Sequence, residues 1–372
     1  MGHNKSRSSN KNSKRRKITK GRGFAGLEYL EKKRVLATFT VTNLADGVVG
    51  AAGDLPGSLR QAVFDSNATA GADEIVFNLE DGMNFIPLTE GQLEIRDSLS
   101  ITGPGPFELT ISGSRAGRIF DIYYPYGPIS DVTISGMTLT SGSVDGDGGA
   151  IRTSENLEVR DMILAGNSAD GSGGAIAVVE ELLLADQVIG IGSANLTIVD
   201  SSISGNQASN GGGVAVFSYG AHVTMMNSQV TGNAASFNGG GIAIDTFGGS
   251  STIQDSLFAG NYAVENGGGV HLRSSSLGLN YLQNLVVSAN SAGQDGGGIY
   301  VNNSEGATTV VSDTRVTGNV AGVGGGGIYS GNGTSFVGGG RTEIYQSTIN
   351  DNSAGEDGGG IKAINAEGGQ AE

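Results

Sequence analysis

The chain has 372 residues, of which 65 are glycine and none is cysteine, and its formal net charge is −15. The absence of cysteine excludes disulfide bonds and cysteine-ligated metals as sources of stability. The glycines show no collagen G-X-Y period, so they favour a turn-rich β structure. No stretch approaches the roughly 18 consecutive apolar residues of a membrane-spanning helix. We therefore expect no transmembrane segment.

The positive charge is concentrated at the start of the chain. Residues 1–37 contain 12 Lys and Arg against Glu28 and Glu31, a net charge of +10, and the remainder therefore carries −25. A basic arm can bind nucleic acid, but the acidic remainder would repel it. We predict that residues 1–37 are a basic, disordered leader or targeting segment and that nucleic acid is not a partner. The sequence of residues 27–37 resembles the basic leaders of large bacterial surface and secreted proteins.

Residues 38–100 are predicted to form an N-terminal cap and the first coils. Ser58 is the predicted N-cap residue of a helix, and Gln61, three residues later, completes a capping box. An apolar helix face begins with Leu59 and Val63. We expect this helix to cover the open end of the first coil, because unpaired strand backbone there would pair with other chains. Strand-like segments occupy 38–43, 74–77, 85–88 and 99–103.

The same segment resembles the N-terminal part of bacterial right-handed parallel β-helix proteins with a CSLREA-type start. Residues 57–62 read G-S-L-R-Q-A where that family has its S-L-R-E-A motif, without the leading cysteine. Together with its flanking strands, the similar region covers residues 38–125. The resemblance implies a right-handed parallel β-helix that begins here.

From residue 137 onward one sequence motif recurs. It consists of the aliphatic end of a strand, a Gly-Asn turn, a few small residues, two or three glycines and a β-branched residue. Its copies lie about 28 residues apart, which is typical of a solenoid whose coils stack at about 4.8 Å. After each glycine cluster the pattern has period two, which indicates half-buried strands. The predicted fold class is therefore all-β: a single-stranded right-handed parallel β-helix with an N-terminal capping helix. Its repeats fill residues 101–372, and its C-terminal end is expected to be uncapped.

Aligning the repeats places three polar positions in columns. The first is the turn asparagine, predicted to be a structural ladder of amides that hydrogen-bond from coil to coil. It comprises Asn167, Asn206, Asn233, Asn261, Asn290, Asn319 and Asn352. The second lies six residues earlier and comprises Asp161, Asp200, Asn227, Asp255, Asn284, Asp313 and Gln346. The third precedes the aliphatic residue after the glycines by four positions and comprises Asp147, Ser172, Asn210, Asn238, Asn266, Asp295, Gly324 and Asp357.

One surface departs from the repeat. On the outer face of the strand after the glycines, successive coils carry Asp245, His271, Arg273, Tyr300, Asn302 and Tyr329. Their spacing predicts an ion pair between Asp245 and Arg273. It also predicts an aromatic column formed by His271, Tyr300 and Tyr329. Exposed aromatic side chains beside polar groups suit carbohydrate or protein contacts. The alternative is a cross-strand stack that stabilises the sheet by roughly 0.2–1 kcal/mol per pair.

The repeats also resemble those of polymorphic outer-membrane proteins, which pair G-G-A-I with F-x-x-N tetrapeptides. Residues 148–151 and 173–176 match the first motif and residues 258–261 the second, while elsewhere Ile, Val or Leu replaces the Phe. Members of that family are surface-exposed adhesins exported by a C-terminal β-barrel, which implies an extracellular or cell-surface location. No barrel-like segment follows the repeats in this sequence, and we expect end-to-end association at the uncapped edge.

An enzymatic interpretation is the alternative, because many parallel β-helices cleave acidic polysaccharides. Lyase chemistry needs clustered carboxylates for Ca²⁺ and a base, and hydrolysis needs two carboxylates at a set separation. Here most acidic residues fall in register, as turn columns do, although Asp145, Asp147 and Asp170 could hold Ca²⁺ between two coils. The H-E-x-x-H, G-x-S-x-G and G-x-x-x-x-G-K-[ST] motifs are absent from the sequence.

The sequence therefore predicts a non-catalytic scaffold, secreted or displayed on the cell surface, with an adhesive role and without a cofactor. Its expected partner is a carbohydrate or a surface protein. A polysaccharide lyase or glycoside hydrolase acting along the rod is the second hypothesis.

Overall fold

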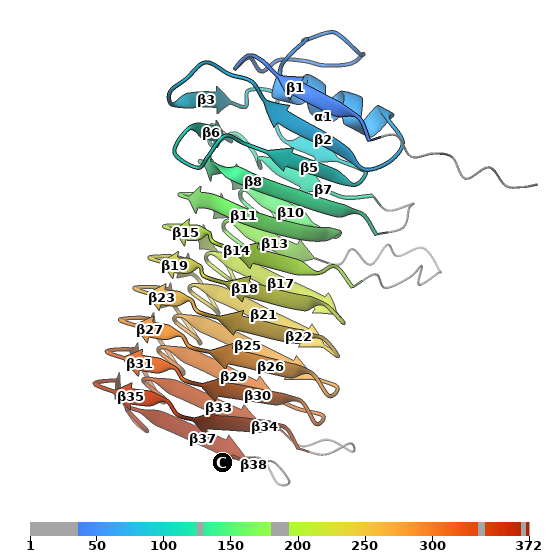
Figure 1. Cartoon of the computed structure of the whole chain (residues 1–372). Coiled ribbons are helices and arrows are strands. Elements are labelled where there is room, and N and C mark those ends of the chain that lie inside the picture. The colour runs from blue at the N-terminus through green and yellow to red at the C-terminus, as the bar shows by residue number, and fades with distance from the viewer. Residues whose placement is uncertain (1–35, 125–128, 180–192, 334–338, 366–369, 372) are drawn as a thin grey trace, which may run out of the picture. The chain divides into compact units, whose positions relative to one another are not determined.

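A computed structural model describes residues 36–124, 129–179, 193–333, 339–365 and 370–371. Residues 34–372 form one compact unit. Within it the described strands build a parallel β-helix, in which each coil stacks on the one before it (Figure 1). The predicted fold class, a parallel β-helix with an N-terminal helix, is confirmed. The predicted leader lies almost entirely outside the described residues.

The described strands form three parallel sheets. The ten-stranded sheet holds β4 (Leu93–Ile95), β7 (Phe120–Ile122), β10 (Ile151–Thr153), β13 (Ile176–Val179), β17 (Val214–Tyr219), β21 (Ile242–Phe247), β25 (Val270–Ser275), β29 (Ile299–Asn303), β33 (Ile328–Asn332) and β37 (Ile361–Asn365). The eight-stranded sheet holds β9 (Ser143–Val144), β12 (Ser168–Ala169), β16 (Gln207–Ala208), β20 (Ala234–Ala235), β24 (Tyr262–Ala263), β28 (Ser291–Ala292), β32 (Val320–Ala321) and β36 (Ser353–Ala354).

The twenty-stranded sheet contributes two strands to most coils. It holds β1 (Thr38–Val41), β2 (Asp73–Phe77), β3 (Asn84–Pro87), β5 (Leu99–Thr102), β6 (Leu109–Ser112), β8 (Asp131–Thr140), β11 (Asn156–Ala165), β14 (Leu196–Val199), β15 (Ser202–Ser204), β18 (His222–Met226), β19 (Gln229–Thr231), β22 (Ser250–Gln254), β23 (Leu257–Ala259), β26 (Leu279–Gln283), β27 (Val286–Ser288), β30 (Thr308–Ser312), β31 (Arg315–Thr317), β34 (Arg341–Tyr345), β35 (Thr348–Asn350) and β38 (Gln370–Ala371).

One repeat shows the path of a coil. β21 lies in the ten-stranded sheet, β22 and β23 in the twenty-stranded sheet and β24 in the eight-stranded sheet, after which β25 pairs with β21. Asp255 separates β22 from β23 with φ of 53°. All seven residues of the second polar column have φ between 50° and 53°. Asn and Asp tolerate this left-handed conformation better than most residues, so the column marks a backbone corner.

The turn asparagines stack as a hydrogen-bonded ladder. In a typical step, the Nδ2 of Asn233 donates to the Oδ1 of Asn261 and to the carbonyl oxygen of Ile203, both at 3.0 Å. The backbone nitrogen of Asn233 donates to the same Oδ1 at 3.0 Å. Equivalent bonds run from Asn167 to Asn352. The ladder thus satisfies buried backbone and side-chain groups together.

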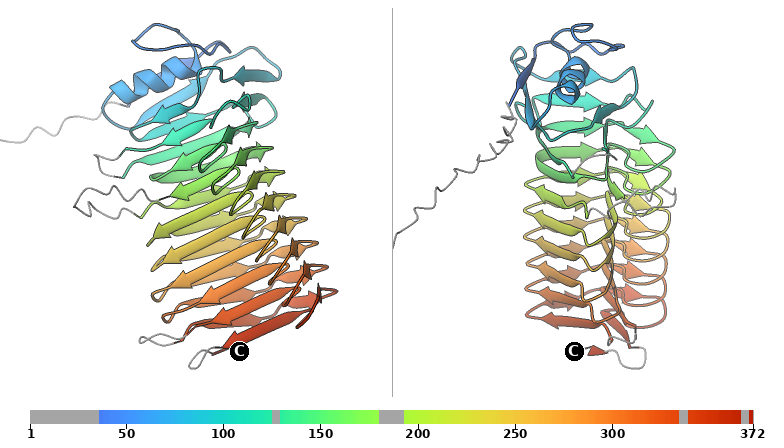
Figure 2. Two further views of the ribbon diagram at one scale, coloured as in Figure 1. Left: turned by 180° about the vertical axis from the view of Figure 1, so that it is seen from behind. Right: turned by 90° about the vertical axis from the view of Figure 1, so that its right-hand side faces the viewer.

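Helix α1 (Leu59–Ala68) covers the first coil (Figure 2). The Ser58 side chain accepts a hydrogen bond from the Gln61 backbone nitrogen at 3.1 Å, as an N-cap should. The predicted capping box is only half formed. Ser58 already donates its backbone N–H to the Leu55 carbonyl, so the Gln61 side chain instead accepts from the Leu55 nitrogen at 2.9 Å. The preceding loop is thereby tied to the helix start.

Candidate functional site

The outer face of the ten-stranded sheet carries one continuous column of side chains. Parallel register aligns the second residue of each strand, since residues one strand apart pair directly. From the N-terminal side the column reads Glu94, Asp121, Arg152, Ala177, Ala215, Ala243, His271, Tyr300, Tyr329 and Lys362. Charged residues therefore begin it, alanines occupy the middle, and rings with a terminal lysine end it.

The alanine rows show what the repeat normally places at this position. Ala177, Ala215 and Ala243 point outward, yet each is at most 1% exposed. The glycine turn before each strand lies against them: a Cβ built on Gly239 would approach the Ala243 Cβ to 2.7 Å. A methyl group is covered by this turn, whereas a larger side chain must project past it. The rings of the next three coils are therefore departures from the repeat's own packing.

His271, Tyr300 and Tyr329 form the aromatic stack. The ring centroids of His271 and Tyr300 are 4.8 Å apart with planes 4° apart, and those of Tyr300 and Tyr329 are 4.8 Å apart with planes 1° apart. The spacing between strands sets this distance. Because the ring faces cover one another, the half-buried stack presents its edges and tyrosine hydroxyls to solvent. These are hydrogen-bonding groups at regular intervals.

A second outward column flanks the stack. Asp245, Arg273 and Asn302 are aligned on successive strands. The Asp245 Oδ2 and Arg273 Nη1 are 3.6 Å apart, with side chains 40% and 64% exposed. An ion pair so open to solvent contributes little stability. The structure thus brings all six residues singled out from the sequence onto one face, which we call the stack face.

The protonation of the stack follows from its partial burial. Burial lowers the pKa of His271 to about 4, and the positive charge of Arg273 acts in the same direction. Burial raises the pKa of Tyr300 and of Tyr329. At neutral pH the imidazole and both phenols are therefore uncharged, so the stack face offers neutral hydrogen-bond donors and acceptors.

The lowered pKa of His271 predicts a loss of stability in acid. The group binds a proton below pH 6.5 in the unfolded chain but only below about pH 4 in the folded one. Its contribution is therefore complete above pH 6.5 and is lost as the pH falls toward 4. At roughly 1.4 kcal/mol per pKa unit, the loss is at most about 3 kcal/mol.

Urea unfolding of the wild type and of His271→Phe at pH 7 and pH 4.5 measures this effect. Burial raises the pKa of Asp245 and Glu155, which acts in the opposite direction, so the comparison is between the two proteins. We expect the wild type to lose more stability than the variant. Equal losses would show that the imidazole is as easily protonated in the folded chain as in the unfolded one.

Lys362 extends the stack face and was not recognised from the sequence. Its Nζ lies 5.9 Å from the centroid of the Tyr329 ring and 3.6 Å and 3.7 Å from carboxylate oxygens of Asp295 and Asp357. Gly324 makes this possible, because a Cβ there would collide with the lysine side chain. The sequence feature that could have indicated this contact is Gly324, which interrupts the third polar column.

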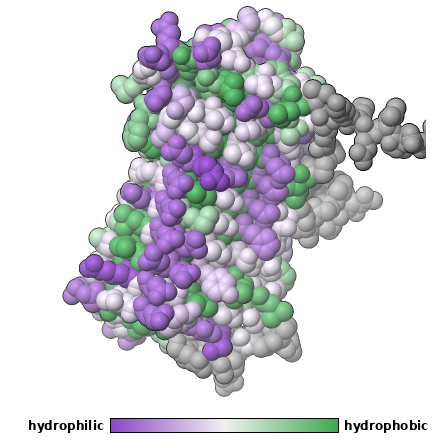
Figure 3. All heavy atoms as spheres, viewed as in Figure 1, coloured by the Kyte–Doolittle hydropathy of each residue, from purple (hydrophilic) through white to green (hydrophobic). Residues whose placement is uncertain are grey.

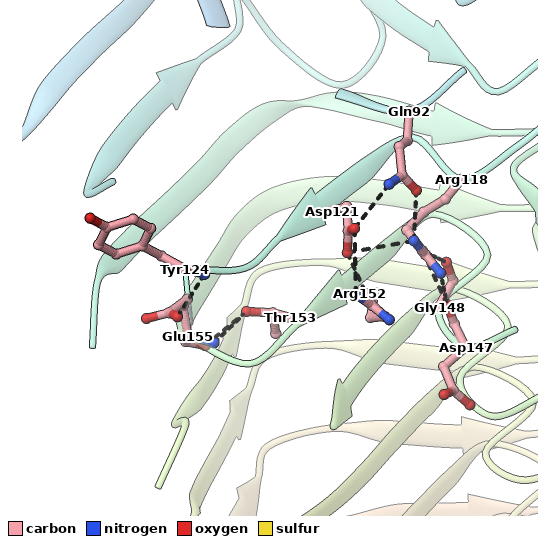
Figure 4. A network of polar contacts seen from close by, with 9 residues as sticks. All are labelled: Gln92, Arg118, Asp121, Tyr124, Asp147, Gly148, Arg152, Thr153 and Glu155. Carbon is pink, nitrogen blue, oxygen red and sulfur yellow. Dashed lines mark hydrogen bonds and ion pairs between the residues drawn. The ribbon is translucent and has the colours of Figure 1, made fainter. Parts of the chain in front are cut away.

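A charged cluster occupies the N-terminal end of the same column (Figure 4). Asp121 lies 2.8 Å from Arg152 Nε and 3.5 Å from Arg118 Nη1. Gln92 donates to Asp121 at 2.9 Å and accepts from Arg118 at 2.6 Å. Arg118 also donates to the Asp147 carbonyl oxygen. Because these groups satisfy one another across several coils, the cluster fastens the first coils together.

Glu155 is a buried carboxylate that lies apart from that cluster, next to Tyr124 and Thr153 (Figure 4). It accepts hydrogen bonds from the backbone nitrogens of Ser130 at 2.6 Å and Tyr124 at 3.2 Å. Burial raises its pKa, and these two bonds oppose the effect. Both Glu155 and the charged cluster lie in irregular early coils, where the repeat spacing gave no column to read.

The comparisons with known proteins assign no family to the chain. No protein-family model matches the chain, and no curated protein is similar to it in sequence. Among solved structures, the A-module of mannuronan C-5 epimerase AlgE6 from Azotobacter vinelandii is similar over 82% of this chain and 95% of that chain. The identity is 11% and the TM-score 0.32. This likeness concerns the parallel β-helix fold alone.

The residues considered for Ca²⁺ do not form a metal-binding group: within the described ranges, no three His, Asp or Glu side chains are grouped so that they could hold a metal ion. The Asp147 carboxylate accepts a hydrogen bond from the Ser172 backbone nitrogen at 2.7 Å. In the part of the chain that the structure describes, no helix has the length and apolar character to cross a bilayer.

A cavity of about 460 Å³ lies between α1 and β4, lined in part by Arg60, Phe64 and Glu94. Arg60 pairs with Asp46 at 2.6 Å and donates to the carbonyl oxygen of Gly91 at 2.8 Å. Its guanidinium is thus committed to holding the loop before the helix, and the cavity belongs to the cap. The stack face therefore remains the best candidate site.

Proposed function

We propose that this protein is a secreted or cell-surface scaffold that binds carbohydrate through the stack face without transforming it. The observation that carries the proposal is the aromatic stack itself, which replaces buried alanine on three successive coils. Side chains that must project past a covering turn are placed there for contact with something outside the fold. Tyrosine edges beside Asn302 and Arg273 have the amphipathic character that recurs in binding surfaces.

The electrostatics favour a neutral ligand over a polyanion. The net charge of the chain is −15, and a strongly acidic protein repels polyanions at long range. The face drawn in Figure 3, on the side of the twenty-stranded sheet, has hydrophilic residues in a band that runs from coil to coil and apolar residues beside it. A neutral polysaccharide, whose hydroxyls can bond with the uncharged stack, fits the stack face best.

Binding to immobilised neutral glycans tests the proposal. We expect Tyr300→Ala to weaken binding at least tenfold, because it removes a hydroxyl and opens the stack between His271 and Tyr329. The matched control is Tyr262→Ala, since Tyr262 is 48% exposed but lies on the eight-stranded sheet. Equal binding by both variants, or binding only to surface proteins, would contradict the proposal.

One observation favours a second candidate function, the cleavage of a polysaccharide. Lys362 and the two tyrosines, which depart from the repeat, lie with Asp295 and Asp357 of the third polar column on one face. General acid–base chemistry requires such a group of acids and bases. Incubation with neutral and acidic polysaccharides, with and without Ca²⁺, separates the two functions. New reducing ends or unsaturated products that disappear in Lys362→Met would establish the enzyme and overturn the non-catalytic scaffold.

A further inference from the structure

Two inward columns at one corner of the coils are mostly polar, although they face the core. The corner lies where each strand of the ten-stranded sheet turns into the twenty-stranded sheet. One column comprises Ser218, Thr246, Ser274, Asn303 and Asn332. The other comprises Val223, Ser251, Asn280, Thr309 and Thr342. Polar groups in such a place need partners, because burying one without a hydrogen bond costs free energy.

In the later coils the two columns satisfy each other directly. The Thr309 Oγ1 donates to the Asn303 Oδ1 at 3.0 Å, and the Thr342 Oγ1 donates to the Asn332 Oδ1 at 3.1 Å. The Nδ2 of Asn303 also donates to Thr342 at 3.1 Å, which joins the two coils. An asparagine facing a threonine therefore spans the corner.

In the two coils before them the same corner contains polar atoms without a partner in the protein. Thr246 and Ser251 hold the two positions in one coil, and Ser274 and Asn280 hold them in the next. The Asn280 Nδ2 donates to the Thr309 Oγ1 at 3.4 Å. Their exposed fractions are 2%, 0%, 1% and 0%. Neither hydroxyl of the first pair, nor the Ser274 Oγ or the Asn280 Oδ1, has a hydrogen-bond partner. Four buried polar atoms without partners in the protein thus lie in adjacent coils.

The side chains explain why these pairs do not meet. Ser274 with Asn280 has fewer side-chain heavy atoms than Asn303 with Thr309, and Thr246 with Ser251 has fewer still. The Ser274 hydroxyl points toward the turn, since a Cβ on Gly278 would collide with it. Shorter side chains on a backbone of the same register leave space between polar groups. Each of the two coils offers two unpaired polar atoms, and a buried water molecule needs two to four polar partners.

We propose that ordered water binds in this corner, bridging Thr246 with Ser251 and Ser274 with Asn280. A cation is the poorer occupant, because the four groups are neutral and an unpaired charge in the core is costly. The bridging molecules continue the Asn303–Thr309 network through the coils that carry the first rows of the stack face. They make the corner as rigid as its directly bonded neighbours.

A crystal structure of the wild type at better than roughly 2 Å resolution tests the proposal, since at such resolution buried waters with about three partners are ordered. We expect one density peak in each of the two coils, within hydrogen-bond distance of the named oxygens. The Asn303–Thr309 corner in the same crystal is the internal control and should show none. Empty density, or side chains turned to bond directly with one another, would overturn the proposal.

The double variant Ser274→Asn with Asn280→Thr gives a second, independent test. It reproduces the Asn303–Thr309 pair one coil earlier, so the water in that coil should disappear while the urea midpoint stays the same or rises. The peak between Thr246 and Ser251 should remain. Persistence of the peak in the altered coil, with the new pair bonded directly, would show that the water does not depend on these groups.

Discussion

Replacement of Asn261 by alanine is expected to lower the free energy of unfolding by about 4 kcal/mol. The Asn261 Nδ2 donates to the Val230 carbonyl oxygen at 2.8 Å and to the Asn290 Oδ1 at 2.9 Å. Its Oδ1 accepts from the backbone nitrogen and from the Nδ2 of Asn233, both at 3.0 Å. Alanine therefore leaves two donors and one acceptor of the preceding coil without this partner and removes one of two bonds to the Asn290 Oδ1 of the next coil. Each unpaired group costs roughly 1–3 kcal/mol before relaxation.

Urea unfolding of Asn350→Ala provides the matched control. Asn350 is exposed and lies two residues before the ladder position Asn352, so its removal should cost less than about 0.5 kcal/mol. Hydrogen exchange then locates the damage: amides next to Asn261 should lose protection first. A small, equal cost for both variants would mean that water replaces the ladder amide without loss, contrary to its buried position.

The ladder and the stack were predictable from the sequence for the same reason. A fixed repeat length places equivalent residues one strand apart, so Asn233 must meet Asn261, and Tyr300 must meet Tyr329. The prediction needed no knowledge of the bends. The strand β4 and the half-formed capping box at Gln61 lie outside the repeat, so the repeat spacing could not predict them. The Gln61 side chain bonds to Leu55 in the preceding loop, and local sequence patterns alone did not identify that partner.

The polar interior corner could have been found but was not. Thr246, Ser274 and Asn303 recur at the repeat spacing on inward-facing positions, yet none of the three predicted polar columns contains them. The contact of Lys362 with Asp295 was harder, because it reaches over Gly324 across two coils. Contacts that skip a coil depend on side-chain length and local space, which spacing does not encode.

Gly268→Ala is expected to destabilise the protein by more than about 3 kcal/mol. Gly268 has no left-handed φ, so conformational freedom is not the reason for the glycine. A Cβ there would collide with the Gly297 carbonyl oxygen and lie 2.5 Å from the Ser291 carbonyl oxygen, both in the next coil. These are backbone atoms held by the sheet ladder, and they cannot move without parting the coils.

Gly260→Ala separates the two reasons for glycine in this fold. Gly260 has φ of 65° and nothing within 4 Å of a built Cβ, so alanine there costs only the left-handed conformation, roughly 1–2 kcal/mol. Thermal and urea unfolding of both variants should rank Gly268→Ala as the more damaging. The reverse order would mean that the coils can separate at the glycine turns. The rigid spacing that places the stack face one strand apart from coil to coil would then lack its physical basis.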